Sequence, residues 1–326
     1  MTVAHQESFT EARVERAVEG LSLSRLALRR LLKDKLTMVS LVVVVIFLLL
    51  AVSAPFLSAT GILKPNAYHE DLIDKISGGL PNAQGGMSWS HPLGVEPTTG
   101  RDVLSRIVLG ITFSLSIALG AAILSVLIGT VLGIISGYVG GLTDMWISRL
   151  VDLTLSFPQT LMLLALSGVL IEQLVSMGIP AGNVANGVYE ILVLGLFGWP
   201  SFARLIRGQV LSQREREYIE AARSLGAKNR RIYFKELLPN LWAPVLVYFT
   251  LVLPQFISAE AALSFLGVGI KPPTPTLGNI LTASTNYAES DFSFFLFPAL
   301  FIATLVVSFN LLGDGLRDAL DPKAGR

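Results

Sequence analysis

The sequence predicts an all-α integral membrane protein with six transmembrane helices and both termini in the cytoplasm. Hydrophobic residues make up 52% of its 326 residues and charged residues only 15%, a balance typical of membrane proteins and not of soluble domains. Several uncharged stretches reach the roughly 20 residues that a helix needs to cross a bilayer. Lys and Arg are concentrated in alternate connecting segments, which indicates the orientation of the chain.

Six stretches are long and apolar enough to predict membrane spans. They are residues 37–57, 108–138, 153–171, 188–203, 241–270 and 292–313. The fourth stretch gives the weakest signal because Glu190, Trp199 and Pro200 interrupt it. The fifth contains a single charged residue, Glu260.

Two local features should shape these helices. The second stretch carries Gly120, Gly129 and Gly133, and small residues in a membrane helix allow a neighbouring helix to approach closely. Phe157-Pro158 falls early in the third stretch, where proline removes a backbone hydrogen bond and kinks the helix. The kink serves either packing or gating, and the residues alone favour neither.

The positive charges place the N-terminus in the cytoplasm. In this orientation 20 of the 25 Lys and Arg residues lie inside and 5 outside, in agreement with the positive-inside rule. The chain then divides into a cytoplasmic N-terminal tail (1–36), a first transmembrane anchor (37–57), an external loop (58–107), a core with five further spans (108–313) that includes the cytoplasmic loop 213–240, and a cytoplasmic C-terminal tail (314–326). The external loop is polar and rich in Gly and Pro, so we expect a small ordered loop and not a domain.

The composition excludes several kinds of chemistry. There is no cysteine, which rules out disulfides and thiolate chemistry. The three histidines, His5, His69 and His91, lack metal-ligand spacing. The sequence has no phosphate-binding loop, zinc-protease motif or nucleophile elbow, and its net charge of +1 shows no basic excess. We therefore predict no catalytic residue, metal or cofactor on this chain and no nucleic-acid partner.

The cytoplasmic segment 213–240 carries the most informative pattern. A polar helix-forming run contains Glu220-Ala221-Ala222 and stops at Gly226, which can adopt the left-handed conformation that ends a helix. A second run, residues 227–238, ends at Pro239. We expect two short helices joined at a corner, with small side chains that let another protein approach. Taken by itself, and without regard to the overall charge, this segment also leaves open a helix pair lying on anionic lipid and a helix-turn-helix for DNA.

This segment resembles the EAA loop of the permeases of binding-protein-dependent ABC importers. The resemblance rests on Glu220-Ala221-Ala222, Gly226 and Leu238-Pro239, while Glu236 stands where the general motif often has isoleucine. It implies that the loop is a coupling helix that docks in a groove of a cytoplasmic ATPase, with Leu225 among the contacting residues.

Further stretches resemble the C-type subunit of the dipeptide and oligopeptide permeases. They are His91-Pro92-Leu93-Gly94, Gly100-Arg101-Asp102-Val103-Leu104-Ser105-Arg106, Gly137-Tyr138-Val139-Gly140-Gly141, Ala259-Glu260-Ala261-Ala262-Leu263-Ser264-Phe265-Leu266-Gly267 and Asn310-Leu311-Leu312-Gly313-Asp314-Gly315-Leu316-Arg317-Asp318. The resemblance implies the type I ABC importer fold in the bilayer of a bacterial cell membrane. The implied partners are a second homologous permease, two ATPase subunits that bind ATP and Mg, and an extracytoplasmic substrate-binding protein. Peptides would enter by alternating access.

Five residues are candidates for the translocation path or its external mouth. A charge at the centre of a membrane helix costs about 2.5 to 3.5 kcal/mol on insertion scales, so Glu260 should face protein or water. It then either lines the path or is protonated or paired to a neighbouring helix. Phe157 and Pro158 are the candidate gate. Arg101 and Asp102 lie at the external mouth, where they contact a binding protein or fix the local geometry, and Asp102 is equally suited to cap the next helix.

Other functions stay open at this point. The same machinery could import nickel or an opine, although the spans contain no His or Cys cluster that would favour direct metal handling. An intramembrane enzyme would need paired catalytic groups at one depth, and the sequence offers none. A secondary transporter would need charged residues inside broken helices, for which Glu260 alone is little support.

Overall fold

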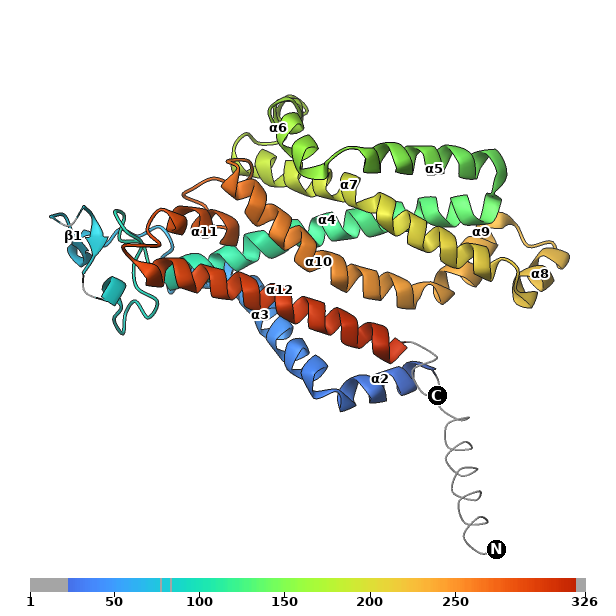
Figure 1. Ribbon diagram of the computed structural model, residues 1–326, viewed down its shortest axis with the longest axis horizontal. Helices are drawn as coiled ribbons and strands as arrows, with labels where there is room; N and C mark the ends of the chain where they lie inside the picture. The colour runs from blue at the N-terminus through green and yellow to red at the C-terminus, as the bar shows by residue number, and fades with distance from the viewer. Residues whose placement is uncertain (1–22, 77, 83, 321–326) are drawn as a thin grey trace, which may run out of the picture.

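The computed structural model describes residues 23–76, 78–82 and 84–320, so residues 1–22 and 321–326 of the two predicted tails lie outside the described residues. Within this part the chain is almost entirely helical (Figure 1). Six of its helices are long and apolar enough to cross a membrane: α3 (Lys35–Ala59), α4 (Val103–Val139), α6 (Gln159–Ser176), α7 (Asn183–Gln213), α10 (Trp242–Phe265) and α12 (Phe292–Leu320). The predicted architecture of six spans is confirmed.

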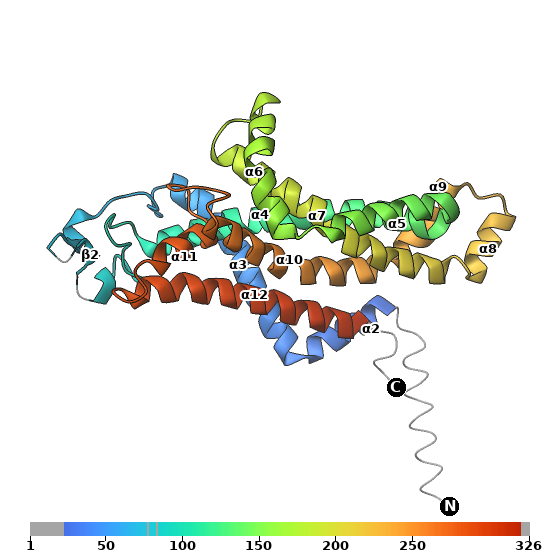
Figure 2. The same ribbon diagram turned by 45° about the horizontal axis from the view of Figure 1, so that its top comes forward.

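The bundle is built around α4 and α7. The 37-residue helix α4 packs extensively against α7 and also contacts α10 and α3. Helix α12 lies against α10 and α3. These helices form one elongated bundle, whereas α6 stands out from it (Figures 1 and 2).

Glycine allows the close approach of α4 to α7. A Cβ atom on Gly133 would lie 2.8 Å from the carbonyl oxygen of Ala203, and one on Gly129 would lie 2.8 Å from the ring of Phe202. Gly120 faces α7 in the same way. The predicted close packing at these glycines is confirmed, and a larger side chain would force the two helices apart.

The predicted third span consists of two helices. Helix α5 (Gly141–Ser156) ends at Phe157, whose backbone is extended, and α6 begins after Pro158. Proline lacks the amide proton that would continue the helix and disfavours helical backbone at the preceding residue. The sequence predicts a kink here, but the structure shows a complete break at which α6 turns out of the bundle (Figure 2).

Helices extend into both predicted tails and past the predicted fourth span. Helix α7 runs through Pro200 to Gln213, well beyond the predicted end at residue 203. Helix α12 continues to Leu320. Helix α2 (Leu23–Lys33) forms within the predicted N-terminal tail and packs against α12. The first described helix, α2, therefore lies beside the last, α12.

The predicted fifth span ends early. Helix α10 stops at Phe265, and a non-helical stretch leads to the short helix α11 (Leu277–Thr285). The hydroxyl of Thr276 accepts the Asn279 amide at 3.1 Å, and the Asn279 side chain accepts the Thr276 amide at 3.0 Å. Asn279 also donates to the carbonyl of Ile270 at 3.1 Å. These bonds satisfy backbone groups that an irregular segment at this depth would otherwise leave unpaired.

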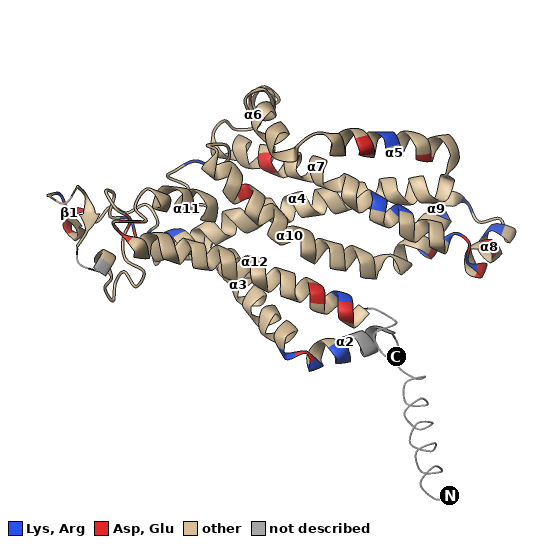
Figure 3. Ribbon diagram, in the orientation of Figure 1, with Lys and Arg blue, Asp and Glu red and all other residues tan. Residues whose placement is uncertain are grey.

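The segment between α3 and α4, which the sequence predicts to be external, holds little regular structure. It contains two short 3-10 turns, η1 (Glu70–Leu72) and η2 (Gln84–Gly86), and an antiparallel pair, β1 (Ile73–Asp74) with β2 (Leu80–Pro81). In Figure 1 this segment lies at the opposite end of the bundle from the cytoplasmic loop that follows α7. Figure 3 shows that charged residues gather toward the two ends, while the long helices between them carry few charges.

Candidate functional site

The loop between α7 and α10, which the sequence predicts to be cytoplasmic, folds as a helical corner. Its first arm, α8 (Glu217–Ser224), is followed by Gly226 with a φ of +76°, in the left-handed region. The second arm consists of α9 (Asn229–Arg231), the π-helical turn η3 (Ile232–Leu237) and the 3-10 turn η4 (Leu238–Asn240). The predicted corner is confirmed. The second arm is not a regular α-helix, in part because Pro239 cannot donate a backbone hydrogen bond.

Buried side chains fix this corner to the bundle. Ile219, Ile232 and Leu237 are fully buried and pack in one cluster with apolar residues at the cytoplasmic end of α7. The guanidinium of Arg223 lies 4.9 Å from the ring centre of Tyr138 on α4, and its Nε donates to the tyrosine hydroxyl at 3.1 Å. A force applied to the corner therefore acts directly on α4 and α7.

The outer surface of the corner carries most of the predicted coupling residues. The exposed ones are Glu220, Ala221, Leu225, Gly226 and Pro239. Leu225 is 88% exposed, which is unusual for a large apolar side chain. Ala222 is half-buried, and Leu238 packs against the cluster that anchors the corner. The first group is available to a partner, whereas Leu238 helps to hold the corner in place.

At the other end of the bundle, Asp102 caps α4. One of its carboxylate oxygens accepts the backbone amide of Ser105 at 2.7 Å, and the other lies 2.9 Å from Nδ1 of His91. The side chain is almost fully buried. The capping role that the sequence suggested for Asp102 is confirmed.

Arg101 belongs to a buried cluster of charges. Its Nε donates to Glu96 at 2.6 Å, and Nε of Arg106 lies 3.6 Å from the same carboxylate oxygen. Arg106 also donates to the carbonyl oxygens of Pro65 at 3.4 Å and Pro273 at 3.3 Å. The cluster joins the external segment, α4 and the stretch before α11. Sequence reasoning missed it because Glu96 and Arg106 carry no spacing signal and meet only in the folded chain.

Glu260 faces protein inside the chain. One oxygen accepts the hydroxyl of Ser114 on α4 at 2.8 Å and the other that of Ser264 at 3.1 Å, and the side chain is fully buried. Glu190 on α7 is buried as deeply, and within the described residues neither of its carboxylate oxygens has a hydrogen-bond partner. The sequence shows Glu190 only as an interruption of the fourth span. Two buried carboxyl groups therefore lie in this part of the bundle.

Two ion pairs tie α5 to α7 near the cytoplasmic side. Arg207 donates to both oxygens of Asp144, at 2.6 and 2.7 Å, and Arg204 pairs with Asp152. The hydrogen bond from Arg207 lowers the pKa of Asp144 to about 2. Val151 is the only buried residue of α5 and packs against Trp199 and Ala203 of α7, so the two ion pairs supplement a small apolar contact.

The candidate gate residues lie apart from these groups. Phe157 and Pro158 are exposed at the elbow between α5 and α6. The predicted site residues thus fall in four places: the cytoplasmic corner, the buried Glu260, the elbow, and the external start of α4.

Two protein families match this chain. Residues 129–326 match the family described as binding-protein-dependent transport system inner membrane component, and residues 22–74 match the N-terminal transmembrane domain of oligopeptide transport permease C. The chain belongs to this permease family. It is therefore a non-catalytic, multi-pass inner-membrane component of a binding-protein-dependent ABC transport system, and the resemblance drawn from the sequence is confirmed.

Individual relatives match about three quarters or more of the permease. It is 37% identical to the dipeptide permease DppC of Alkalihalophilus pseudofirmus over 92% of its length and 90% of the relative's. It is 37% identical to the oligopeptide permease OppC of Bacillus subtilis over 94% and 91%. The glutathione permease GsiD of Escherichia coli is 39% identical over 74% and 75%.

A solved structure supports the fold. A chain of the inward-facing MetNI methionine ABC transporter superposes with a TM-score of 0.52 at 21% identity, covering 67% of the permease and 96% of that chain. At this identity the likeness concerns the fold alone.

Proposed function

We propose that this permease imports di- or oligopeptides into the cell. Three relatives with 37 to 39% identity are named for dipeptides, oligopeptides and glutathione, and glutathione is itself a small peptide. Nickel or an opine would be a different cargo for the same machinery. Direct uptake assays with the complete transporter in vesicles decide between them.

The proposed assembly contains one such chain, a second homologous permease, two cytoplasmic ATPase subunits that bind ATP and Mg, and an extracytoplasmic binding protein. Helix α6 supports the presence of the second permease, because it stands out from the bundle (Figure 2) with large apolar side chains such as Leu161 and Val169 exposed. Lipid or a second membrane protein must cover such a face.

The cytoplasmic corner is the proposed coupling site. The observation that carries this proposal is the fixed attachment of exposed Glu220, Ala221 and Leu225 to α4 and α7 through a buried apolar cluster. An ATPase that binds this surface differently in its two nucleotide states would shift the permease between two conformations. The translocation path would then open alternately to the outside and to the inside of the cell.

The remaining predicted residues are assigned roles in the same cycle. We propose that the elbow at Phe157 and Pro158 absorbs the change in direction between α5 and α6, because a break in a helix concentrates bending. Glu260 is proposed to hold α4 against α10 beside the path. Arg101 and Asp102 are proposed to keep the external start of α4 in the position that the binding protein meets.

A detergent pull-down of the tagged chain from its native membrane tests the assembly. The expected result is recovery of a second permease and of ATPases with a phosphate-binding loop, with ATP hydrolysis stimulated by peptide-loaded binding protein. A chain that purifies alone and stays folded would refute the assembly. Peptide uptake driven by a proton or sodium gradient without ATP would favour a secondary transporter instead.

A further inference from the structure

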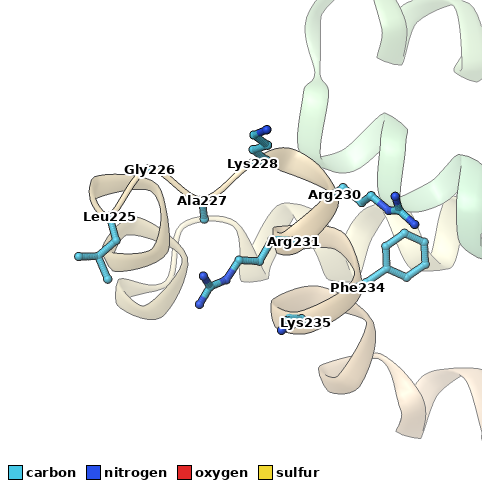
Figure 4. Close-up of a pocket in the computed structure, with 8 residues that line it drawn as sticks. All are labelled: Leu225, Gly226, Ala227, Lys228, Arg230, Arg231, Phe234 and Lys235. Carbon is cyan, nitrogen blue, oxygen red and sulfur yellow. The ribbon is translucent and has the colours of Figure 1, made fainter.

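A basic cleft opens on the second arm of the cytoplasmic corner. It has a volume of about 600 Å³, and its lining includes Leu225, Lys228, Arg230, Arg231, Phe234 and Lys235 (Figure 4). All four cationic residues are exposed. No carboxylate lines the cleft, and among the described residues none of the four forms an ion pair.

The two arms of the corner differ in charge. The first arm carries both signs, with the exposed carboxylates of Glu217 and Glu220 in the first turn of α8 and the exposed cations Arg216 and Arg223 at its two ends. The second arm presents the four cations of the cleft, with Glu236 half-buried and outside its lining. Leu225 lies between the two arms at the corner and is 88% exposed. A partner complementary to this surface must present basic groups to the carboxylates of α8, an apolar pocket to Leu225 and acidic groups to the cleft.

The position of the cleft favours a protein partner over lipid headgroups. Helix α7 continues from Arg204, already paired with Asp152, to Gln213. At 1.5 Å per residue this is about 13 Å of further helix before the loop begins. Figure 3 shows that charged residues already appear on α5 and α7 before the chain reaches α8. The cleft therefore lies beyond the apolar part of the bundle, in the aqueous phase.

We propose that the cleft receives carboxylate side chains from an acidic patch of the partner ATPase, and that this contact sets the orientation in which the ATPase docks. The inference rests on the proposed coupling function and adds the chemistry of the partner's surface. Unpaired cations attract an acidic surface before contact and speed its approach. The mixed charges of α8 offer an acidic surface no comparable attraction, so the contact at the cleft favours one docking orientation over the reverse.

Carbodiimide cross-linking of the purified permease–ATPase complex tests the contact. This reagent joins a lysine amine to a carboxylate only where the two groups touch. We expect an amide link from Lys228 or Lys235 to an Asp or Glu of the ATPase. The double variant Lys228→Arg, Lys235→Arg keeps both charges but removes both amines, so it should abolish the link while the ATPase still co-purifies.

Charge reversal provides the second measurement. Arg231→Glu should lower the amount of co-purified ATPase about tenfold at low salt, and added salt should weaken the wild-type complex. Arg29→Glu, an exposed change of equal charge on α2, is the matched control and should leave the complex intact. Elution of each variant as a monodisperse permease in detergent shows that it has folded.

The outcomes separate this inference from the proposed function. If no lysine link forms and Arg231→Glu retains the ATPase, the acidic partner is refuted; if Glu220→Arg then still releases the ATPase, coupling at the corner stands. If Glu220→Arg also retains it, both proposals fall. If Arg231→Glu weakens binding to phosphatidylglycerol vesicles but leaves the ATPase bound in lipid-free detergent, the cleft binds lipid and the inference is wrong.

Discussion

Nδ1 of His91 lies 2.9 Å from the carboxylate of Asp102, which also accepts the first-turn amide of Ser105 at 2.7 Å. The ring of His91 lies against that of His69, with ring centres 4.6 Å apart. One nearly buried carboxylate thus joins the external segment to the start of the longest helix in the bundle. One oxygen of Asp102 faces His91 and the other accepts the Ser105 amide. Substitutions of Asp102 can therefore separate the contributions of these two contacts to stability.

Asp102→Ala should lower the free energy of unfolding by about 1 kcal/mol through loss of the helix cap alone, with a further loss because His91 loses its partner. Asp102→Ser keeps an oxygen that can cap α4 but is too short to hold His91, so its loss should be smaller. Thermal unfolding of the purified permease in detergent measures both. Equal losses in the two variants would show that the cap contributes nothing.

Glu96→Gln should be far more damaging. It removes the carboxylate that faces both Arg101 and Arg106, each less than a tenth exposed, and breaking a buried ion pair costs about 3 to 5 kcal/mol. We expect a large fall in the yield of monodisperse protein on size-exclusion chromatography. Glu70→Gln, which breaks the solvent-exposed pair with Lys75, is the control and should behave as wild type. Equal yields for the two variants would contradict the buried cluster.

Gly133→Leu should separate α4 from α7. Even a single added carbon atom would lie 2.8 Å from the backbone of α7, and overpacking a tight interface costs about 1 to 3 kcal/mol. Gly168→Leu on α6 is the matched control, because nothing lies within 4 Å of a Cβ atom there. The melting temperature in detergent should fall in the first variant and stay unchanged in the second. A fall of the same size in both would mean that leucine disturbs the helices by itself.

Gly226→Pro and Glu220→Arg should each abolish transport while membrane insertion stays intact. Proline fixes φ near −65°, which is incompatible with the +76° of Gly226, so the corner would lose its shape. Glu220→Arg reverses an exposed charge on the coupling surface without touching the anchoring cluster. Peptide uptake into vesicles, normalised to the amount of permease in the membrane, is the measurement. Unchanged uptake in either variant would count heavily against the coupling role of the loop.

The contact between Asp144 and Arg207 should depend on pH in a defined window. Hydrogen bonding to Arg207 lowers the pKa of Asp144 from 3.8 to about 2, so the folded protein favours the ionised form. The stabilisation is present above about pH 4 and is lost as the pH falls toward 2. The difference in melting temperature between wild type and Asp144→Asn should therefore be constant from pH 8 to 5 and shrink below pH 4. A constant difference throughout would exclude the ion pair as its cause.

The sequence predicts the spans well because their signal is local. An uncharged run of about 20 residues and the distribution of Lys and Arg depend on no distant contact. The corner at Gly226 is local too, since a glycine that stops one helical run before a second one signals a left-handed residue. The close approach of α7 to α4 at Gly129 and Gly133 could be predicted as well, because the small residues that permit it are visible in the sequence.

The groups that the sequence did not predict depend on distant contacts. Glu96 and Arg106 meet only because the external segment folds back onto α4, and Asp144 meets Arg207 across two helices. Helix α11 is too short for a clear periodicity. Its capping box also uses Asn279 in place of the usual Glu or Gln. The break at Pro158 was expected as a kink, because the sequence does not show that α6 turns away from the bundle.

Helix α4 contains no proline along its 37 residues, whereas α3, α7, α10 and α12 each contain one, at Pro55, Pro200, Pro254 and Pro298. At 1.5 Å per residue it is about 55 Å long, nearly twice the thickness of the hydrocarbon layer. We expect a helix of this length to act as a lever that pivots near its midpoint. A rotation of about 10° around its midpoint moves each end by about 5 Å in opposite directions. In the proposed assembly, a small displacement at the end nearest the ATPases would therefore reach the opposite end of the helix with its direction reversed.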